Sequence, residues 1–318
     1  MILRSSRKKN NTEQGRFLYR AYGLSISSEL EFPDLPEGSE PVDVTVRFDD
    51  IAPDAISFTN RGGDFALNRG VFYGKLRPKG LCLVKDGREI ILDQVDELDR
   101  EVLRAYVLTP ILGSLLHQRG RLPIHASAVA GPQGAVLFCG HNGAGKSTQA
   151  AAFCERLGWR HLSDDLTLVT VQKEDYLVVP GCPTRKLWPS SFELIGGPPQ
   201  EARKIYNDKF LIPNIKTFAT EPVKICAIIC LEGGLEGSSF YEIFGLSKLA
   251  KLREHIFFPR FLEVGGSNPG CSESMVGLAR VTPLFLCDPT KQDIGVLCET
   301  IIQQLESLSC LQELEPES

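Results

Sequence analysis

The feature that most constrains this chain is a glycine-rich turn between an apolar run and a helix-forming segment. The apolar run, Ala135–Cys139, has the length and composition of a buried strand. Residues 140–147 then read Gly-His-Asn-Gly-Ala-Gly-Lys-Ser and fill every fixed position of G-x-x-x-x-G-K-S/T, the P-loop. The next segment, Thr148–Leu157, is rich in alanine and favours a helix. This order of strand, loop and helix predicts an α/β domain.

The spacing of the loop suits a phosphate group. The glycines at 140, 143 and 145 allow backbone angles that a side chain would forbid, so successive N–H groups can turn inward around an anion. The helix that follows points its positive end at the same place. Lys146 would reach the terminal phosphates, and the Ser147 hydroxyl would hold Mg²⁺. An accidental glycine-rich turn is the alternative, but the position between a strand and a helix favours a nucleotide site, with ATP as the default ligand.

Composition limits the classes of partner. The 318 residues carry 35 basic and 40 acidic side chains, a net charge of −5, which argues against a general nucleic-acid binder. No apolar stretch approaches the ~20 residues that span a bilayer, and no apolar segment of a signal peptide follows the basic N-terminus. The ten cysteines lack paired spacings, and several lie in apolar runs, which favours reduced thiols. We therefore expect a cytoplasmic protein with neither membrane nor nucleic-acid partners.

The chain divides into four expected parts. A flexible N-terminus is predicted over residues 1–16, and a small β-rich domain over 17–95, where β-branched and aromatic runs alternate with tight turns. A helical period begins near Glu97 and runs to about His117, with Pro110 expected to kink it. The P-loop domain is predicted over residues 96–310, followed by an acidic tail, 311–318.

Four later segments complete the expected P-loop domain. Val223–Leu231 is apolar almost throughout and predicts a central strand. Residues 196–213 combine glycines and prolines with basic residues and read as a mobile basic lid. Residues 265–274 are expected to form a loop, and Asp288 with Pro289 is expected to cap a last helix that runs to about residue 308.

Two adjacent aspartates, Asp164 and Asp165, lie where one predicted strand ends and the next begins. Phosphoryl transfer to a hydroxyl needs a carboxylate that accepts the proton while a metal and a lysine neutralise the phosphates. On an extended backbone the two side chains would point to opposite sides, one toward the acceptor and the other toward the metal or the scaffold. An ordinary turn is the alternative for the pair, and a structural role explains His125 as well as a catalytic one does.

These residues carry a resemblance to a known family. The segment Ile124-His125, the loop at 140–147 and Leu162-Ser163-Asp164-Asp165 resemble the catalytic domain of the bacterial HPr kinase/phosphorylase family. The resemblance implies a P-loop fold of the HPr kinase and phosphoenolpyruvate carboxykinase type. A closer resemblance, over most of the chain, is to HPr-kinase-like proteins of ribosomal peptide clusters, notably lasso-peptide precursor kinases. It extends to Tyr22–Leu30, Glu221–Glu232 and Ala279–Leu286.

The resemblance implies roles for individual residues. His125 corresponds to the family's active-site histidine, Lys146 to its phosphate lysine, Ser147 to its metal-binding serine and Asp165 to its proton acceptor. The expected catalytic residues are therefore Asp165, Asp164, His125 and Lys146, and the expected metal contacts are Ser147 and Asp165.

One segment departs from the family's pattern. In place of its Glu-Ile-Arg-Gly the chain has Thr184-Arg185-Lys186, without an acid, so the second metal contact and a reverse phosphorylase activity stay open. Arg185 is expected to clamp phosphate oxygens, with a solvated loop arginine as the alternative. The predicted nucleotide contacts are Gly140, His141, Asn142, Gly143, Ala144, Gly145, Lys146, Ser147, Thr148 and Arg185.

The sequence thus predicts an ATP- and Mg²⁺-dependent kinase that phosphorylates a serine hydroxyl of a precursor peptide or a protein. The chain has neither the Asn-Lys-x-Asp motif of GTPases nor the Leu-Ser-Gly-Gly signature of transporter ATPases. Two alternatives stay open, a kinase of a free amino acid or sugar and a nucleotide-sensing module without catalysis. The acceptor, the role of the N-terminal domain and the oligomeric state, including a homo-oligomer, are not decided by the sequence.

Overall fold

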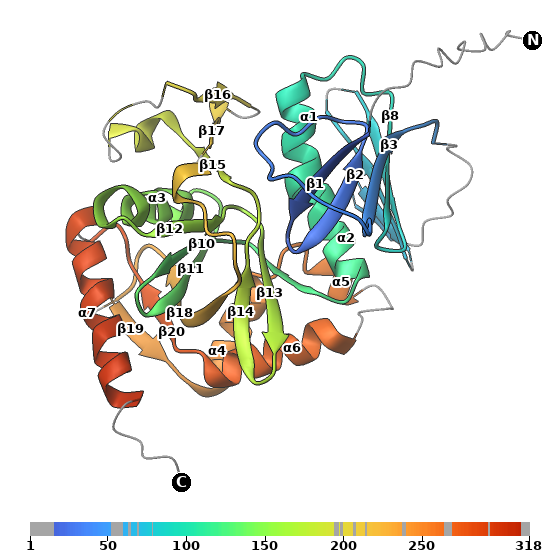
Figure 1. Ribbon diagram of the computed structural model, residues 1–318. Coiled ribbons are helices and arrows are strands. Elements are labelled where there is room, and N and C mark those ends of the chain that lie inside the picture. Colours follow the sequence, from blue (N-terminus) through green and yellow to red (C-terminus); the bar gives the residue numbers. More distant parts are fainter. Residues whose placement is uncertain are drawn as a thin grey trace, which may run out of the picture.

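The structure, a computed structural model, describes most of the chain between residues 16 and 312 (Figure 1). The described range has gaps at 52–59, 63–64, 69, 78, 194–196, 198–199, 206–207, 214, 237–239, 264–268 and 292. The N-terminus predicted to be flexible lies outside the described residues up to residue 15, and the acidic tail lies outside them from residue 313. Two large β-sheets, each with helices packed against it, make the fold mixed α/β.

The N-terminal sheet contains eight of the described strands, in the order β1-β2-β3-β8-β7-β6-β5-β4. Strands β2, β3 and β8 run parallel, and the other neighbouring pairs run antiparallel. The strands are Phe17–Ala21 (β1), Leu24–Ser28 (β2), Val44–Phe48 (β3), Asn60–Gly62 (β4), Phe65–Asn68 (β5), Val71–Lys75 (β6), Leu81–Lys85 (β7) and Glu89–Asp93 (β8). A β-rich N-terminal sheet was the expectation from the sequence, and the structure confirms it.

A broken helix follows the N-terminal sheet and packs onto it. It consists of α1 (Arg100–Tyr106), a π-helical segment (Val107–Ile111) and α2 (Leu112–Gln118). Pro110 lies in the π-helical segment, where the wider turn relieves the crowding and the lost N–H that a proline imposes on an α-helix. Leucines of this helix share one apolar core with the N-terminal sheet and with residues of the second sheet. The boundary predicted at residues 95/96 therefore runs through a continuous core.

The second sheet holds the P-loop strand near its centre, with the strand order β12-β10-β11-β18-β14-β13-β9 and with β20 and β19 joined to it through β18. Strand β18, Val223–Leu231, confirms the predicted central strand and runs parallel to β11 and β20. The other strands are Leu122–Ile124 (β9), Ala126–Gly131 (β10), Gly134–Gly140 (β11), Arg160–Ser163 (β12), Thr167–Gln172 (β13), Asp175–Val179 (β14), Phe240–Ile243 (β19) and Leu284–Cys287 (β20).

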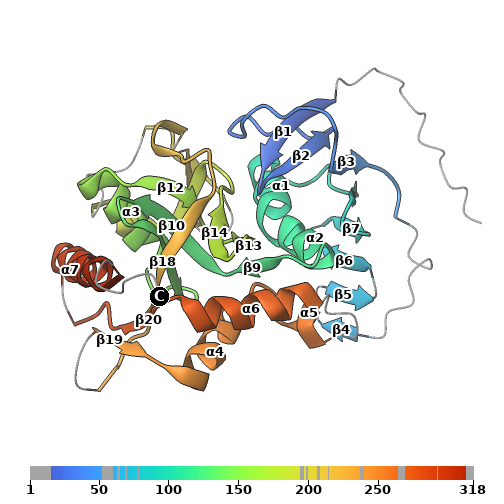
Figure 2. The ribbon, with the colours of Figure 1, turned by 60° about the horizontal axis from the view of Figure 1, so that its bottom comes forward.

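Helices cover both faces of the second sheet (Figures 1 and 2). Helices α3 (Lys146–Leu157) and α7 (Ile294–Gln312) lie on one face, and α4 (Gly245–Glu254) and α6 (Pro269–Val281) on the other. The short helix α5 (Arg260–Glu263) lies beside the N-terminal sheet (Figure 2). Along β11, Val136 and Phe138 join the core under α3, while Leu137 joins the core under α6, as strand alternation requires. Within the described residues no helix is long and apolar enough to cross a bilayer.

Two expectations about the C-terminal part are wrong. Residues 269–274, expected as loop, begin helix α6, because Cys271, Met275 and Leu278 form one apolar helical face on the second sheet. Asp288 does not cap the last helix. Its carboxylate accepts the N–H groups of residues 234 and 235, at 2.8 and 3.0 Å, whereas Asp293 accepts the Gly295 N–H at 2.7 Å where α7 begins.

A third, small sheet lies above α3 and is called here the roof sheet (Figure 1). Its strands, in the order β15-β17-β16, are Thr184–Leu187 (β15), Phe210–Pro213 (β17) and Arg203–Lys204 (β16). Leu187 and Ile212 pack on Ala151 of α3, which seats the sheet on the P-loop helix. The segment predicted as a basic lid, 196–213, is therefore a β-hairpin in its described part.

Candidate functional site

The phosphate loop has the backbone that its glycines predict. Strand β11 ends at Gly140 and α3 begins at Lys146. Gly143 and Gly145 have φ angles of 84° and 96°, which a side chain would strain. At Gly140 a Cβ atom would lie 2.7 Å from the carbonyl oxygen of Leu231 on the neighbouring strand, so only glycine fits there. The glycines at these positions therefore allow the backbone of a phosphate-binding loop.

The lysine of the loop is buried and points back over it. Lys146 Nζ donates hydrogen bonds to the carbonyl oxygens of Gly140, at 2.9 Å, and His141, at 3.1 Å. Burial lowers the pKa of Lys146, while Asp165 and Asp164 act in the opposite direction and favour its charged form. A phosphate in the loop would offer this ammonium group a stronger acceptor than a carbonyl oxygen.

Asp164 lies beneath the loop, with both of its carboxylate oxygens in use. Oδ1 accepts hydrogen bonds from the hydroxyls of Ser147, at 2.7 Å, and Ser127, and Oδ2 accepts the backbone N–H of Lys186 at 2.6 Å. The structure thus places Asp164 against the serine predicted to bind the metal. Sequence reasoning had named Asp165 for that place beside Ser147.

The Asp165 side chain contacts a different part of the chain from Asp164. The cause is a turn of the backbone and not the strand alternation expected from the sequence. Strand β12 ends at Ser163, and Asp165 has a left-handed φ of 64°, so the pair forms a turn and not an extended segment. The Asp165 carboxylate lies 3.2 Å from Lys186 Nζ, and Lys186 Nζ also donates to Thr109 Oγ1 at 2.6 Å. Burial alone would raise the pKa of Asp165, but Lys186, Lys209 and His125 hold it well below its ordinary value. Asp165 therefore stays ionised.

His125 connects the aspartate turn to the phosphate loop. Its Nδ1 lies 2.9 Å from the carbonyl oxygen of Asp165, and its Nε2 lies 3.1 Å from Asn142 Oδ1. Burial and the nearby Lys146 lower the pKa of His125, and Asp165 offsets part of that effect. A neutral ring can donate to a carbonyl only from a protonated Nδ1, so the Asp165 carbonyl selects that tautomer. With its proton on Nδ1, the neutral ring has an acceptor at Nε2, and Asn142 Oδ1 is an acceptor too, so only the contact with the Asp165 carbonyl is a hydrogen bond of the neutral histidine.

The phosphate loop and Asp165 border a cavity of about 470 Å³. Of the predicted site residues, the cavity is lined by Asn142, Gly143, Gly145, Lys146, Ser147, Thr148 and Asp165. The lining does not include Gly140, His141, Ala144, His125, Asp164 or Arg185. Residues around the start of α7 also line the cavity, namely Pro289, Asp293, Ile294 and Leu297. The phosphate loop and the start of α7 therefore border the same cavity.

The roof sheet supplies cavity residues that sequence reasoning missed. Lys186 and Trp188 line the cavity, and Lys209, from the facing strand end, lies with its Nζ 5.7 Å from the centre of the Trp188 ring. Arg185, which was predicted to clamp phosphate, is buried and donates to Glu155 Oε1 of α3 at 2.5 Å. Because residues alternate along a strand, Lys186 faces the cavity where Arg185 cannot. Recognising 184–187 as a strand would have identified Lys186.

Comparison with known proteins gives one partial family match. Residues 90–191 match the model of the family described as SynChlorMet cassette protein ScmC. This range is about a third of the chain, and it contains the phosphate loop and the aspartate pair. No curated protein is significantly similar to the chain.

Among solved structures, the HPr(Ser) kinase/phosphatase from Coxiella burnetii matches with a TM-score of 0.32 and 12% sequence identity. The match covers 57% of this chain and 94% of that one. The similarity is distant, and at this TM-score it establishes neither a common fold nor a common activity.

Proposed function

We propose that this chain is an ATP- and Mg²⁺-dependent kinase that transfers the γ-phosphate to the hydroxyl of a serine in a peptide or protein. The observation that carries the proposal is the difference in surroundings between two adjacent acids. Asp164 is held against Ser147 below the phosphate loop, whereas Asp165 lines the cavity above it. Phosphoryl transfer needs one acid for the metal and one for the incoming hydroxyl.

The residues beside the loop fit Mg²⁺. A serine hydroxyl and a carboxylate are the hard oxygen ligands that this ion prefers, and Ser147 and Asp164 place them 2.7 Å apart. Ser147 would hold the ion directly, with Asp164 behind it. When bound, Mg²⁺ supplies positive charge at the phosphate oxygens. We propose Asp164 for the metal side in preference to Asp165, because Asp164 accepts the Ser147 hydroxyl, whereas Asp165 lines the cavity beside Lys186.

The chain's own groups would bind and orient the reacting atoms. The amides of Gly143 to Ser147 and the ammonium of Lys146 would hold the phosphates, while Lys186 and Lys209 would neutralise charge on the cavity side. Asp165 would accept a hydrogen bond from the acceptor hydroxyl and align it for attack. The hydroxyl oxygen would attack the γ-phosphorus as the bond to ADP breaks, and its proton would pass to Asp165. In a loose transition state this proton transfer is late, so a carboxylate with a low pKa can serve this role.

The direct test is transfer of label from γ-³²P-ATP, with Mg²⁺, to an immobilised library of serine-containing peptides. We expect label on serine peptides with the wild-type chain and none with Lys146→Ala, which should also lose ATP affinity. Label that appears only on free amino acids or sugars would contradict a peptide acceptor and support the small-molecule kinase. Tight ATP binding with no transfer to any hydroxyl would support the nucleotide sensor instead.

A further inference from the structure

One residue of the N-terminal sheet lies beneath the aspartate turn of the second sheet. Tyr22 and Gly23, with φ angles of 53° and 69°, form the tight turn between β1 and β2. The Tyr22 side chain is only 3% exposed, and its backbone N–H donates to the carbonyl oxygen of Pro180 at 3.0 Å. The turn of the N-terminal hairpin is thus inserted into the part of the chain that carries the site.

The Tyr22 hydroxyl points at two carbonyl groups from different segments. It lies 3.3 Å from the carbonyl oxygen of Leu166 and 3.5 Å from that of Leu108. Leu166 directly follows Asp165, and Leu108 directly precedes Thr109. The hydroxyl therefore makes long, weak contacts with the backbone of the aspartate turn and with the backbone of the π-helical segment.

Both segments determine where the Asp165 carboxylate lies. Thr109 accepts a hydrogen bond from Lys186 Nζ at 2.6 Å, and the same Nζ atom lies 3.2 Å from Asp165 Oδ2. The Tyr22 hydroxyl thus closes a ring of contacts: Leu108 to Thr109 along the chain, Thr109 to Lys186, Lys186 to Asp165, and Asp165 to Leu166 along the chain. A shift of either backbone segment would change the Lys186–Asp165 distance.

The ring of Tyr22 has little freedom to move. A Cβ atom on Gly181 would lie 2.8 and 3.1 Å from two carbons of the ring, so the backbone of Gly181 approaches the ring as closely as a glycine allows. The Cys182 thiol lies 3.9 Å from the hydroxyl oxygen. This packing holds the hydroxyl between its two acceptors.

We propose that Tyr22 is a positioning residue for Asp165 and Lys186, so that the N-terminal sheet completes the active site. The proposal rests on the proposed function, since it assigns Tyr22 to the same transfer reaction. Tyr22 does not line the cavity. It acts through the two backbone segments that hold the acid and its lysine.

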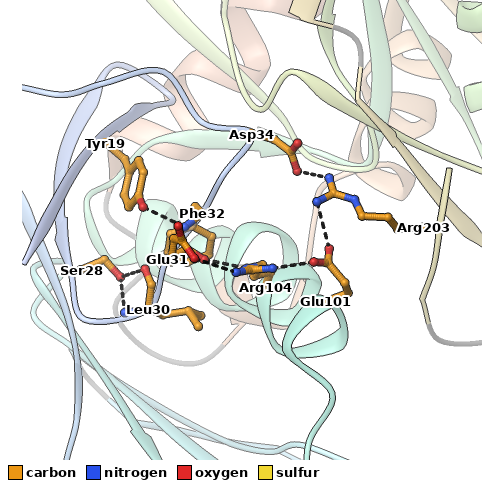
Figure 3. A network of polar contacts seen from close by, with 9 residues as sticks. All are labelled: Tyr19, Ser28, Leu30, Glu31, Phe32, Asp34, Glu101, Arg104 and Arg203. Atoms are coloured by element: carbon orange, nitrogen blue, oxygen red, sulfur yellow. Dashed lines mark hydrogen bonds and ion pairs between the residues drawn. The ribbon is translucent and has the colours of Figure 1, made fainter. Parts of the chain in front are cut away.

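The chain offers a matched control for the loss of one buried hydroxyl. Tyr19, on β1 of the same sheet, accepts the Phe32 N–H on its hydroxyl oxygen at 2.9 Å (Figure 3). Tyr22→Phe and Tyr19→Phe each remove one buried hydroxyl from the N-terminal sheet. Only the first removes a contact to the aspartate turn.

The experiment compares the two variants in the full chain. We expect Tyr22→Phe to lower kcat of phosphoryl transfer about tenfold, with the Kd for ATP and the KM for the acceptor peptide unchanged, and Tyr19→Phe to keep the wild-type kcat. Equal losses of kcat in both variants would show a general structural effect and overturn the proposal. A kcat within twofold of wild type for Tyr22→Phe would overturn it as well.

Failure of the proposed function is recognised separately. If the wild-type chain transfers phosphate to no hydroxyl, the kinase assignment fails, and the positioning contact is then judged by hydrogen exchange. We expect amides of residues 107–111 and 164–168 to exchange faster in Tyr22→Phe than in Tyr19→Phe. Equal exchange in the two variants would show that Tyr22 positions neither segment.

Discussion

Asp164 and Asp165 are neighbours in the chain, yet they differ in every contact that decides their chemistry. Asp164 is saturated by two serine hydroxyls and a backbone N–H, so it cannot turn toward an acceptor without losing them. Asp165 keeps its carboxylate on the cavity wall, beside the ammonium of Lys186. The left-handed backbone at Asp165 separates the two directions.

The two acids should therefore respond differently to the same substitution. Asp165→Asn removes the charge that orients the acceptor and should lower kcat at least about 100-fold, within the range expected for general acid–base groups, while the Kd for Mg²⁺-ATP stays within about twofold. Asp164→Asn should instead weaken Mg²⁺-dependent ATP binding. Titration calorimetry with and without Mg²⁺, together with single-turnover transfer, separates the two outcomes. Wild-type transfer by Asp165→Asn would disprove its assignment as the acid for the hydroxyl.

The Lys186–Asp165 pair is buried, with side chains 6% and 13% exposed, so each charge depends on the other. Lys186→Met should lower the free energy of unfolding by about 3 kcal/mol, because it leaves a buried carboxylate without its cation. The double variant Lys186→Met/Asp165→Asn should recover part of that loss, since no charge is then left unpaired. Urea denaturation of the two single variants and the double variant measures the coupling. Strictly additive losses would mean that the pair contributes nothing beyond its separate groups.

At the scale of elements, the roof sheet connects the site to the N-terminal part of the chain. Arg203 of β16 forms ion pairs with Asp34, before β3, and with Glu101 of α1, the latter at 3.6 Å (Figure 3). The hairpin that carries Arg203 also carries Lys209 to the cavity wall. The ion pairs of Arg203 and a lysine that lines the cavity thus belong to the same hairpin.

This shared hairpin predicts a difference between neighbouring residues of β16. Arg203→Met should speed amide exchange in β17 about tenfold, equivalent to about 1.4 kcal/mol, and weaken ATP binding several-fold, because Lys209 is held less firmly. Lys204→Met removes only an exposed ion pair with Asp208 and should change neither quantity. Hydrogen exchange and ATP titration of both variants provide the check. Identical behaviour of the two variants would contradict a role for Arg203 in holding the roof.

The elements also show what could be predicted from the sequence. The P-loop strand, its helix and β18 were predictable because each has a strong local pattern, and the positions of Lys146 and Ser147 follow from the motif. The contacts of Asp164 and Lys186 were not predictable in the same way. They depend on a left-handed turn at one residue and on β15 pairing with β17, which is about 25 residues away in the chain. Patterns within a short window do not contain either fact.

Across the whole molecule, the two large sheets are held by one apolar core and by specific polar contacts. Residues of β2 and β3 share that core with Leu166 and Leu168, which follow the aspartate turn. The Tyr22 hydroxyl, on the turn between β1 and β2, contacts the carbonyl oxygen of Leu166. The ring of His117 on α2 stacks on the ring of Phe261 of α5, with the ring centres 4.8 Å apart. We therefore infer that the N-terminal sheet and the site fold as one unit.

Buried histidines make the stability of the whole molecule dependent on pH. Burial lowers the pKa of His117 to about 4, although its hydrogen bond to the carbonyl oxygen of Phe257 acts in the opposite direction. The unfolded chain binds a proton at this histidine near pH 6.5, whereas the folded chain binds it only near pH 4, so stability falls as the pH drops through this window. His161 and His255, whose pKa values burial also lowers to about 4, act in the same direction.

His117→Gln should remove one of these contributions. Between pH 7 and pH 5 the wild-type chain should lose about 2 kcal/mol more free energy of unfolding than the variant, which is the contribution of one histidine whose pKa falls from 6.5 to about 4. The glutamine side chain of the variant cannot titrate, so the loss that remains in it belongs to the other groups. Urea denaturation of both proteins at the two pH values measures the difference. Parallel losses in wild type and variant would show that His117 takes up its proton equally well in the folded chain, and hence that burial does not keep it neutral.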